Sequence, residues 1–211
     1  MKVVIVSGGT APSDELINKE IEDCTYLICA DSGANCLYEY DICPDFIIGD
    51  FDSIEPKVFE YFKNKHSNII QYPPEKDYTD TEIAVNKAVE LGANKIILLG
   101  CTGTRIDHSL GNLGMLIKCL KLGVSAYIKD KHNVVTITNK PITLLGSRGK
   151  TFSLVAYYEN VDELSISGAK YPLDKFYLEI GNPITISNEF IEEQVEINFK
   201  KGTLLVIYPT E

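Results

Sequence analysis

The chain reads Phe46-Ile47-Ile48-Gly49-Asp50-Phe51-Asp52-Ser53 at residues 46–53, a short apolar run that passes at once into a glycine and two carboxylates. Such a run, stopped by glycine and polar residues, is typical of a buried strand that ends in a loop. Two later segments repeat the arrangement: residues 69–72 run into the acidic segment 73–80, and residues 95–99 run into segment 100–108. These strand ends direct both the fold interpretation and the search for a site.

The first part of the chain alternates apolar runs with helical patterns. Strands are predicted at residues 2–7, 26–30, 46–48, 69–72, 95–100 and 124–129. Residues 80–91 and 107–122 instead repeat apolar side chains at the spacing of one helix face. Strands that alternate with helices predict a mostly parallel sheet covered on both faces. We therefore expect an α/β domain over residues 1–130.

The remainder of the chain shows no helical pattern. Short β-rich runs lie at residues 132–138, 142–145, 151–157, 163–167, 176–180, 184–187, 195–199 and 203–208, with turn residues between them. Regular short strands of this kind predict a small sandwich or barrel. We expect a smaller all-β domain over residues 131–211, so the fold class is α/β followed by a β-rich domain.

The composition is that of a globular protein with a core, because 45% of its 211 residues are hydrophobic and 24% are charged. Thirty acidic against twenty basic residues give a net charge of −10 without a Lys/Arg cluster, so nucleic acid is not an expected partner. No apolar run approaches the ~20 residues that span a bilayer, and the opening run is too short for a signal peptide. Six cysteines without paired spacing indicate reduced thiols. We expect a cytoplasmic protein with no membrane association.

The acidic strand ends predict a metal site. In open α/β sheets, ligands bind beyond the carboxyl ends of the strands, which places Asp50, Asp52 and Asp80 on one rim. Carboxylates held close together repel one another, and a bound Mg²⁺, which prefers oxygen ligands, removes that repulsion. A solvated turn would explain one Asp-x-Asp pair, but three acidic strand ends favour a Mg²⁺ held by Asp50, Asp52 and Asp80.

The helix that begins near residue 80 has its own start signal. Thr79 and Glu82 fit a capping box, with Thr79 as N-cap and Glu82 reaching back to it. That structural role leaves Asp77 and Asp80 unexplained.

Other polar residues at the strand ends favour phosphate binding. Arg105 stands between Gly103 and Asp107, where phosphate contact is the preferred interpretation and a surface charge the alternative. His108 has a plain alternative as a residue at a helix N-terminus. The segment Gly8-Gly9-Thr10 after the first strand suggests a backbone cradle for a phosphate.

Five segments carry a family resemblance by their order and spacing. They are Ala30-Asp31-Ser32-Gly33-Ala34-Asn35, Gly49-Asp50-Phe51-Asp52-Ser53, Lys76-Asp77-x-Thr79-Asp80-x-Glu82, Gly103-x-Arg105-x-Asp107-His108-x-Leu110-x-Asn112 and Ser187-Asn188-Glu189-Phe190. Together they resemble the motifs of the thiamine pyrophosphokinase family over nearly the whole chain. Ser32 and Thr104 depart from it, because each stands where the family commonly has glycine.

The resemblance implies transfer of a pyrophosphoryl group from ATP to the thiamine hydroxyl, giving thiamine diphosphate and AMP. It also implies an N-terminal domain that holds ATP and Mg²⁺, a C-terminal domain that contributes to thiamine binding, and a homodimer with shared active sites. The acidic metal and phosphate centre carries over to Asp50, Asp52, Asp77, Asp80 and Asp107, and catalytic roles are expected for Asp52, Asp77, Asp80, Arg105 and Asp107. Substrate and cofactor contacts are expected at Asp31, Asn35, Asp50, Lys76, Thr79, Arg105 and His108, with thiamine contacts at Ser187 and Phe190. Either Asp80 or Asp107 would accept the hydroxyl proton.

Two other functions remain open at this point. A haloacid-dehalogenase-like phosphatase also carries Asp-x-Asp after a strand, although here the motif follows about the third strand and Ile54 stands where that family usually has Thr or Val. A non-catalytic thiamine or nucleotide sensor on the same fold would not need so many like charges.

Overall fold

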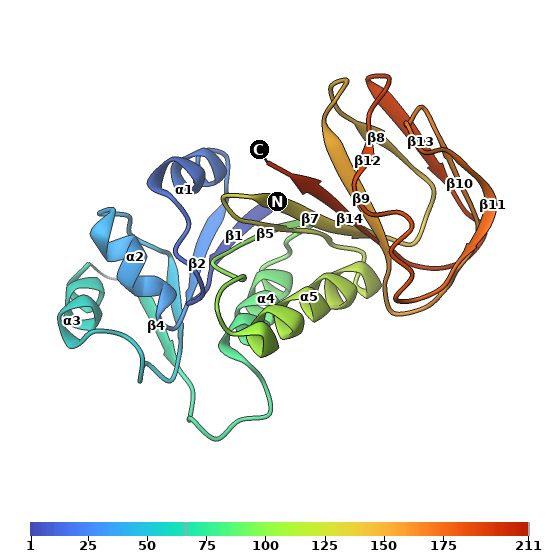
Figure 1. Ribbon diagram of the computed structural model, residues 1–211. Helices are drawn as coiled ribbons and strands as arrows, with labels where there is room; N and C mark the ends of the chain where they lie inside the picture. Colours follow the sequence, from blue (N-terminus) through green and yellow to red (C-terminus); the bar gives the residue numbers. More distant parts are fainter. Residues whose placement is uncertain (66, 211) are drawn as a thin grey trace. The chain divides into compact units, whose positions relative to one another are not determined.

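The computed structural model describes residues 1–65 and 67–210 and divides the chain into two compact units, Met1–Lys131 and His132–Glu211 (Figure 1). Each unit has its own hydrophobic core. No helix among the residues described is long and apolar enough to cross a membrane.

A parallel sheet forms the centre of the first unit. Its strands lie in the order β6-β5-β1-β2-β3-β4, and every neighbouring pair is parallel. The strands are β1 (Lys2–Val6), β2 (Tyr26–Ala30), β3 (Phe46–Gly49), β4 (Asn68–Gln71), β5 (Lys95–Leu99) and β6 (Ser125–Lys129). This sheet confirms the α/β prediction.

Helices cover both faces of this sheet (Figure 1). They are α1 (Asp14–Ile21), α2 (Gly33–Glu39), α3 (Pro56–Asn64), α4 (Asp80–Glu90) and α5 (Ile106–Lys121). One cluster packs Ile17, Leu37 and Phe62 of α1, α2 and α3 against alternate residues of the strands, such as Val4 and Val6. Helix α4 packs against β1, β2 and β3, and α5 packs against α4 and β6.

The strand order reverses between β1 and β5. From β1 the chain adds β2, β3 and β4 on one side, and α4 then leads back to β5, which pairs with the other side of β1. Connections that leave a parallel sheet in opposite directions open a crevice at the reversal. The loops after β1 and β5 border that crevice.

Local sequence signals fix the ends of the helices. Ser13 caps α1 by accepting from Leu16 N at 3.3 Å, and α3 begins at Pro56, whose missing N–H costs nothing in a first turn. At α4, Thr79 Oγ1 accepts from Glu82 N at 3.2 Å, as the capping box predicts. Among the residues described, Glu82 directs its carboxylate to Lys118 at 2.9 Å instead of back to the cap, so only half of the box forms.

The second unit contains two antiparallel sheets, in the orders β12-β9-β14-β7 and β11-β10-β13-β8. The strands are β7 (Asn133–Thr138), β8 (Ile142–Leu145), β9 (Thr151–Ala156), β10 (Val161–Ser167), β11 (Leu173–Leu178), β12 (Asn188–Glu189), β13 (Gln194–Asn198) and β14 (Leu204–Pro209). A shared core joins side chains of both sheets, among them Leu144, Phe152, Leu164, Ile197 and Leu204. This unit is the sandwich form of the predicted domain. The strand predicted at 184–187 is instead a turn that leads into β12.

Phe190 belongs to that core. Its side chain is 1% exposed, and its ring packs edge-on against Phe152 with 4.9 Å between centroids. Gly146 lies so close that a Cβ there would come within 2.7 Å of the Phe190 ring. Phe190 is therefore a core side chain in this structure, and the thiamine contact expected at this residue stays a prediction.

The core position of Phe190 predicts a stability effect. We expect Phe190→Ala to lower the free energy of unfolding by about 3–5 kcal/mol, because it opens a cavity between the two sheets. Tyr171→Ala is the matched control, since that ring is 58% exposed, and its cost should stay below about 1 kcal/mol. Urea denaturation of the full chain measures both. Equal losses in the two variants would contradict a core role for Phe190.

Candidate active site

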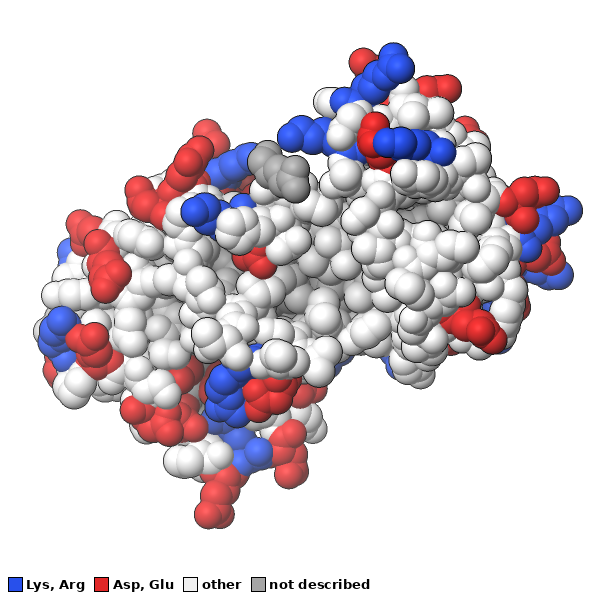
Figure 2. Space-filling view, in the orientation of Figure 1, with Lys and Arg blue, Asp and Glu red and all other residues white. Residues whose placement is uncertain are grey.

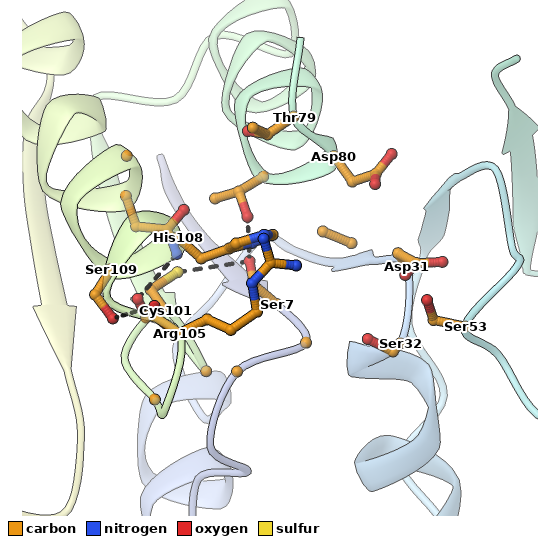
Figure 3. Close-up of a pocket in the computed structure, with 18 of the residues that line it drawn as sticks. Ser7, Asp31, Ser32, Ser53, Thr79, Asp80, Cys101, Arg105, His108 and Ser109 are labelled. Atoms are coloured by element: carbon orange, nitrogen blue, oxygen red, sulfur yellow. Dashed lines mark hydrogen bonds between the residues drawn. The ribbon is translucent and has the colours of Figure 1, made fainter. Parts of the chain in front are cut away.

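A cavity of about 770 Å³ lies at the carboxyl ends of the parallel strands of the first unit. Its walls come from the loops after β1, β2, β3 and β5, the segment before α4, and the start of α5. Figure 3 shows Asp31, Ser32 and Ser53 across the cavity from Arg105 and His108. The acidic strand ends are thus gathered around one hollow.

The loops after β1 and β5 are joined through their backbones. Gly9 N donates to Gly100 O at 2.8 Å, and Thr10 N donates to Thr102 O at 2.7 Å. Only glycine allows this approach, since a Cβ at position 9 would lie 2.4 Å from Thr102 O. The segment predicted as a phosphate cradle is therefore a rigid part of the cavity wall.

Three carboxylates form the acidic group of the site. Asp31, Asp50 and Asp52 each place an oxygen within 4.8 Å of the other two. Asp31 adopts a left-handed backbone with φ of 46°, and a Cβ at Gly49 would lie 3.1 Å from its Cβ. The glycine before Asp50 thus lets the ends of β2 and β3 approach each other. The predicted set of Asp50, Asp52 and Asp80 differs from this group in one member, with Asp31 in the place of Asp80.

Burial and like charge act on this group. Burial raises the pKa of Asp31, and the nearby Asp80 and Asp50 raise it further. Its Oδ1 atom is buried and has no hydrogen-bond partner among the residues described. By contrast, the backbone N–H of Asp52 and then Lys76 lower the pKa of Asp50. An unpartnered buried oxygen beside two more carboxylates fits a divalent cation.

Lys76 lies between two of the acids. Its Nζ atom is 3.2 Å from Asp50 Oδ2 and 2.9 Å from Asp80 Oδ1. Burial alone would lower the pKa of Lys76, but its contacts with Asp80 and Asp50 outweigh burial and raise it. The contact with Asp80 is close but poorly aligned, because Asp80 Oδ1 still lacks a hydrogen-bond partner within the described chain. The lysine thus ties the start of α4 to the end of β3.

Arg105 and Asp107 form an exposed pair on the rim of the cavity. Arg105 donates to both carboxylate oxygens of Asp107, with 2.6 Å between Nη2 and Oδ2. This contact lowers the pKa of Asp107. Both side chains are more than 60% exposed, at 69% and 65%. The pair can therefore rearrange when an anion enters.

The structure brings most of the predicted residues to the cavity. Its walls include Asp31, Asp50, Lys76, Thr79, Asp80, Arg105, Asp107 and His108. Asp52 belongs to the acidic group but does not line the cavity, and Asp77 is exposed outside it. Asn35 is also absent from the walls, because its amide braces the loop after β3: it donates to Ser53 O at 3.2 Å and accepts from Glu55 N at 3.1 Å.

Ser187 belongs to the second unit. It is exposed, its φ is 55°, and its backbone N donates to Ser153 Oγ at 2.9 Å. Its hydroxyl is therefore carried on a fixed turn of the sandwich.

Some cavity residues were missed by sequence reasoning. Ser7, Thr81 and Cys101 line the floor, and Asn112 donates to Cys101 O at 2.9 Å. Asp31 was expected to contact the nucleotide but not to join the metal group. A signal for that role existed, since Asp31 follows an apolar run at 26–30 just as Asp50 follows the run at 46–48.

Charges are mixed over the surface. On the face drawn in Figure 2, Asp and Glu side chains are interspersed with Lys and Arg and no continuous basic patch forms. This pattern suits a small-molecule cavity better than a long polyanion on that face.

Fold and cavity together define the class. A parallel α/β unit with glycine-lined loops and grouped acids at the strand reversal is an enzyme domain built to handle a phosphorylated substrate. Comparisons with known proteins give the family.

Family models match both halves of the chain. Residues 17–128 match the thiamin pyrophosphokinase catalytic domain, and residues 131–204 match the thiamin pyrophosphokinase vitamin B1 binding domain. A thiamine pyrophosphokinase of Bacillus subtilis (strain 168) is 31% identical over 214 residues, covering 100% of both chains. Crystal structures of the thiamine pyrophosphokinases of Bacillus subtilis and Geobacillus thermodenitrificans align with TM-scores of 0.89 and 0.86 at 29% and 32% identity. They cover 100% of this chain and 100% and 98% of theirs. The chain belongs to the thiamine pyrophosphokinase family and is an enzyme, and these matches support neither the phosphatase nor the sensor.

The raised pKa of Asp31 predicts how Asp31→Asn affects stability without metal. A carboxyl whose pKa is raised by folding destabilises the folded state above that pKa, and the penalty disappears as pH falls to the ordinary value of 3.8. In EDTA, we expect Asp31→Asn to unfold at higher urea than the parent at pH 7. Asparagine also tolerates the left-handed backbone. The gain should shrink as pH falls toward 4, as urea midpoints across pH would measure. A constant or growing gain would contradict the assignment.

Proposed function

We propose that this enzyme transfers the pyrophosphoryl group of ATP to thiamine, in a cavity whose acidic group holds Mg²⁺. The thiamine hydroxyl oxygen bonds to the β-phosphorus, and the bond from that phosphorus to the oxygen that bridges it to the α-phosphorus breaks. AMP leaves with the bridging oxygen, and the hydroxyl proton passes to a carboxylate of the cavity. The enzyme acts in the cytoplasm, which agrees with six free cysteines.

The observation that carries this proposal is the acidic group. Asp31, Asp50 and Asp52 lie close enough to share one cation, and the buried Oδ1 of Asp31 lacks a partner among the described residues. These oxygens suit Mg²⁺, which is usually held by a few carboxylates and by substrate phosphates. When bound, Mg²⁺ offsets the negative charge of the phosphate oxygens.

The remaining charges of the cavity suit a polyphosphate. Arg105 is exposed on the rim and carries five N–H donors, which can turn from Asp107 to phosphate oxygens. Lys76 and the backbone of the Gly8-Gly9-Thr10 segment approach the same cavity from its other walls. The side chains of Arg105 and Lys76 hold the phosphates in line with the thiamine hydroxyl, which is the main catalytic requirement of phosphoryl transfer, because the N–H groups of Gly9 and Thr10 already donate to Gly100 O and Thr102 O.

The structure favours Asp80 over Asp107 as the proton acceptor. Arg105 occupies both oxygens of Asp107 and lowers its pKa, which makes that carboxylate a weak base. Asp80 lines the cavity and is 24% exposed against 65% for Asp107, and its Oδ1 atom meets Lys76 Nζ at 2.9 Å without hydrogen-bond geometry, which leaves it better placed to take a proton inside the cavity. Asp77 is exposed outside the cavity walls, so the proposal gives it no contact with the reacting groups.

The proposal assigns ATP to residues 1–130 and a share of thiamine binding to residues 131–211. The match of residues 131–204 to a vitamin B1 binding domain supports this division. Ser187 is its exposed candidate contact. The enzyme works as a homodimer with shared active sites, so sedimentation equilibrium should give about twice the 23.5 kDa of one chain.

Product analysis tests the reaction. With ATP, thiamine and Mg²⁺, the protein should form thiamine diphosphate and AMP in equal amounts, because the attack is on the β-phosphorus. EDTA should abolish turnover, and excess Mg²⁺ should restore it. Chromatography of nucleotides and thiamine species measures both. ADP or inorganic phosphate as the main product would exclude the proposal.

Two substitutions separate the candidate bases. Asp80→Asn should lower kcat by at least about 100-fold, because it removes the proton acceptor, whereas Asp107→Asn should lower it by less than about tenfold. Glu60→Gln is the control, since Glu60 is exposed on α3 and does not line the cavity. Initial rates of thiamine diphosphate formation measure all three. A larger loss in Asp107→Asn than in Asp80→Asn would reverse the assignment.

A further inference from the structure

The first turn of α4 is fixed by a different contact at each residue. Thr79 Oγ1 caps the helix by accepting from Glu82 N, Asp80 pairs with Lys76, and Glu82 pairs with Lys118 of α5. Thr81 makes the fourth contact, at 2.9 Å between its Oγ1 and Ser7 Oγ. The first three contacts each include a side chain that is at least partly exposed. The fourth is buried.

Ser7 and Thr81 belong to a small polar network on the cavity floor. Ser7 is 5% exposed, Thr81 8% and Cys101 2%, and Cys101 Sγ lies 3.5 Å from Ser7 Oγ (Figure 3). Burial raises the pKa of the Cys101 thiol to about 12, so the thiol stays protonated, with Ser7 Oγ at 3.5 Å and Leu99 O at 3.6 Å as its two nearby acceptors. A buried hydroxyl that loses its partner pays the full cost of leaving water, so this network favours one arrangement.

Ser7 is a fixed anchor for that network. Its backbone N donates to Leu99 O at 2.9 Å at the end of β5, and two residues later Gly9 N donates to Gly100 O. The end of β1 is thus joined to the neighbouring strand and to the loop that follows it. Any group held by Ser7 Oγ is held relative to the sheet itself.

Thr81 passes this constraint to Asp80. The two residues are consecutive in the first turn of α4, so fixing the rotation of Thr81 also fixes the direction in which the Asp80 side chain leaves the helix. Asp80 in turn meets Lys76, whose side chain is only 11% exposed. A buried hydrogen bond between residues 74 positions apart thus holds the residue next to Asp80 in the acidic wall.

We propose that the buried Ser7–Thr81 hydrogen bond positions Asp80 and its partner Lys76 for the reaction, so that Thr81 is a positioning residue of the active site. The inference rests on the proposed function for its kinetic consequence and on the contacts alone for its structural one. A role in packing only would cost stability without altering Asp80 or Lys76.

Conservative variants at both ends of the bond separate the two roles. Thr81→Val keeps the shape and removes the hydroxyl, Thr81→Ser keeps the hydroxyl, and Ser7→Ala removes its partner. Thr203→Val is the matched control, because Thr203 is also buried, at 4% exposure, and its hydroxyl bonds Glu159 at 3.2 Å in the second unit. Urea denaturation of all variants, full-length, gives the stability cost of each.

The first readout does not require activity. Brief labelling with an amine-reactive reagent, followed by mass spectrometry, measures the accessibility of Lys76. We expect labelling to rise about threefold or more in Thr81→Val and Ser7→Ala, and to stay at the parent level in Thr81→Ser and Thr203→Val. The double variant Ser7→Ala/Thr81→Val should match the single ones, because both remove the same bond. Unchanged Lys76 labelling in folded Thr81→Val overturns the proposal, whatever reaction the parent protein catalyses.

The second readout is the rate of thiamine diphosphate formation. We expect Thr81→Val to lower kcat about tenfold or more while KM for thiamine stays within about twofold, because a displaced Asp80 affects the transition state more than binding. Thr81→Ser should recover most of the rate, and Thr203→Val should keep kcat. Equal kcat losses in Thr81→Val and Thr81→Ser overturn the proposal. A parent protein that makes no thiamine diphosphate contradicts the proposed function and leaves the labelling result to decide the positioning role.

Discussion

The reversal of strand order between β1 and β5 is the constraint on which the first unit depends. Parallel strands need crossover connections, and after β4 the chain reaches β5 only through α4, which packs across β1, β2 and β3. That path brings the N-terminal turn of α4 to the strand ends, where Thr81 contacts Ser7 at the end of β1. The position of the cavity follows from this path. The absence of a side chain at Gly9 lets the loops after β1 and β5 approach each other in its wall.

Repulsion between the carboxylates of this cavity lowers the stability of the folded protein, and packing in the rest of the unit must compensate for that loss. Asp31 is partly buried in a left-handed backbone, faces Asp50 and Asp80, and has a raised pKa. Such an arrangement destabilises the metal-free protein at neutral pH. A well-packed parallel sheet supplies the compensation, since the residues of β1 from Val3 to Val6 are completely buried. Strain and repulsion collected at one place, inside an otherwise regular fold, are typical of a functional site.

Local patterns predicted most of the fold and part of the site. The strands of the first unit, the helix cap at Thr79 and the acids after β3 all follow from short stretches of sequence, and the structure contains them. The misses are long-range. The Glu82 carboxylate pairs with Lys118, which lies 36 residues further along the chain, instead of with the backbone at the helix cap. The residues around Glu82 in the sequence give no indication of that partner. Phe190 poses a different problem, because the sequence alone does not decide whether an aromatic residue in a polar turn contacts a ligand or belongs to the core. In the structure the Phe190 ring packs against Phe152 in the core of the second unit.

The pairing of β1 with β5 has a consequence for the order of folding during synthesis. β1 leaves the ribosome well before β5, which begins only at Lys95. Until then β1 can pair only with β2, and its other edge remains open, as does the backbone of the loop after it. Unpaired edges of apolar strands are where nascent chains associate wrongly. The open edge of β1 therefore stays available for wrong pairing until β5 has been made and closes the centre of the sheet.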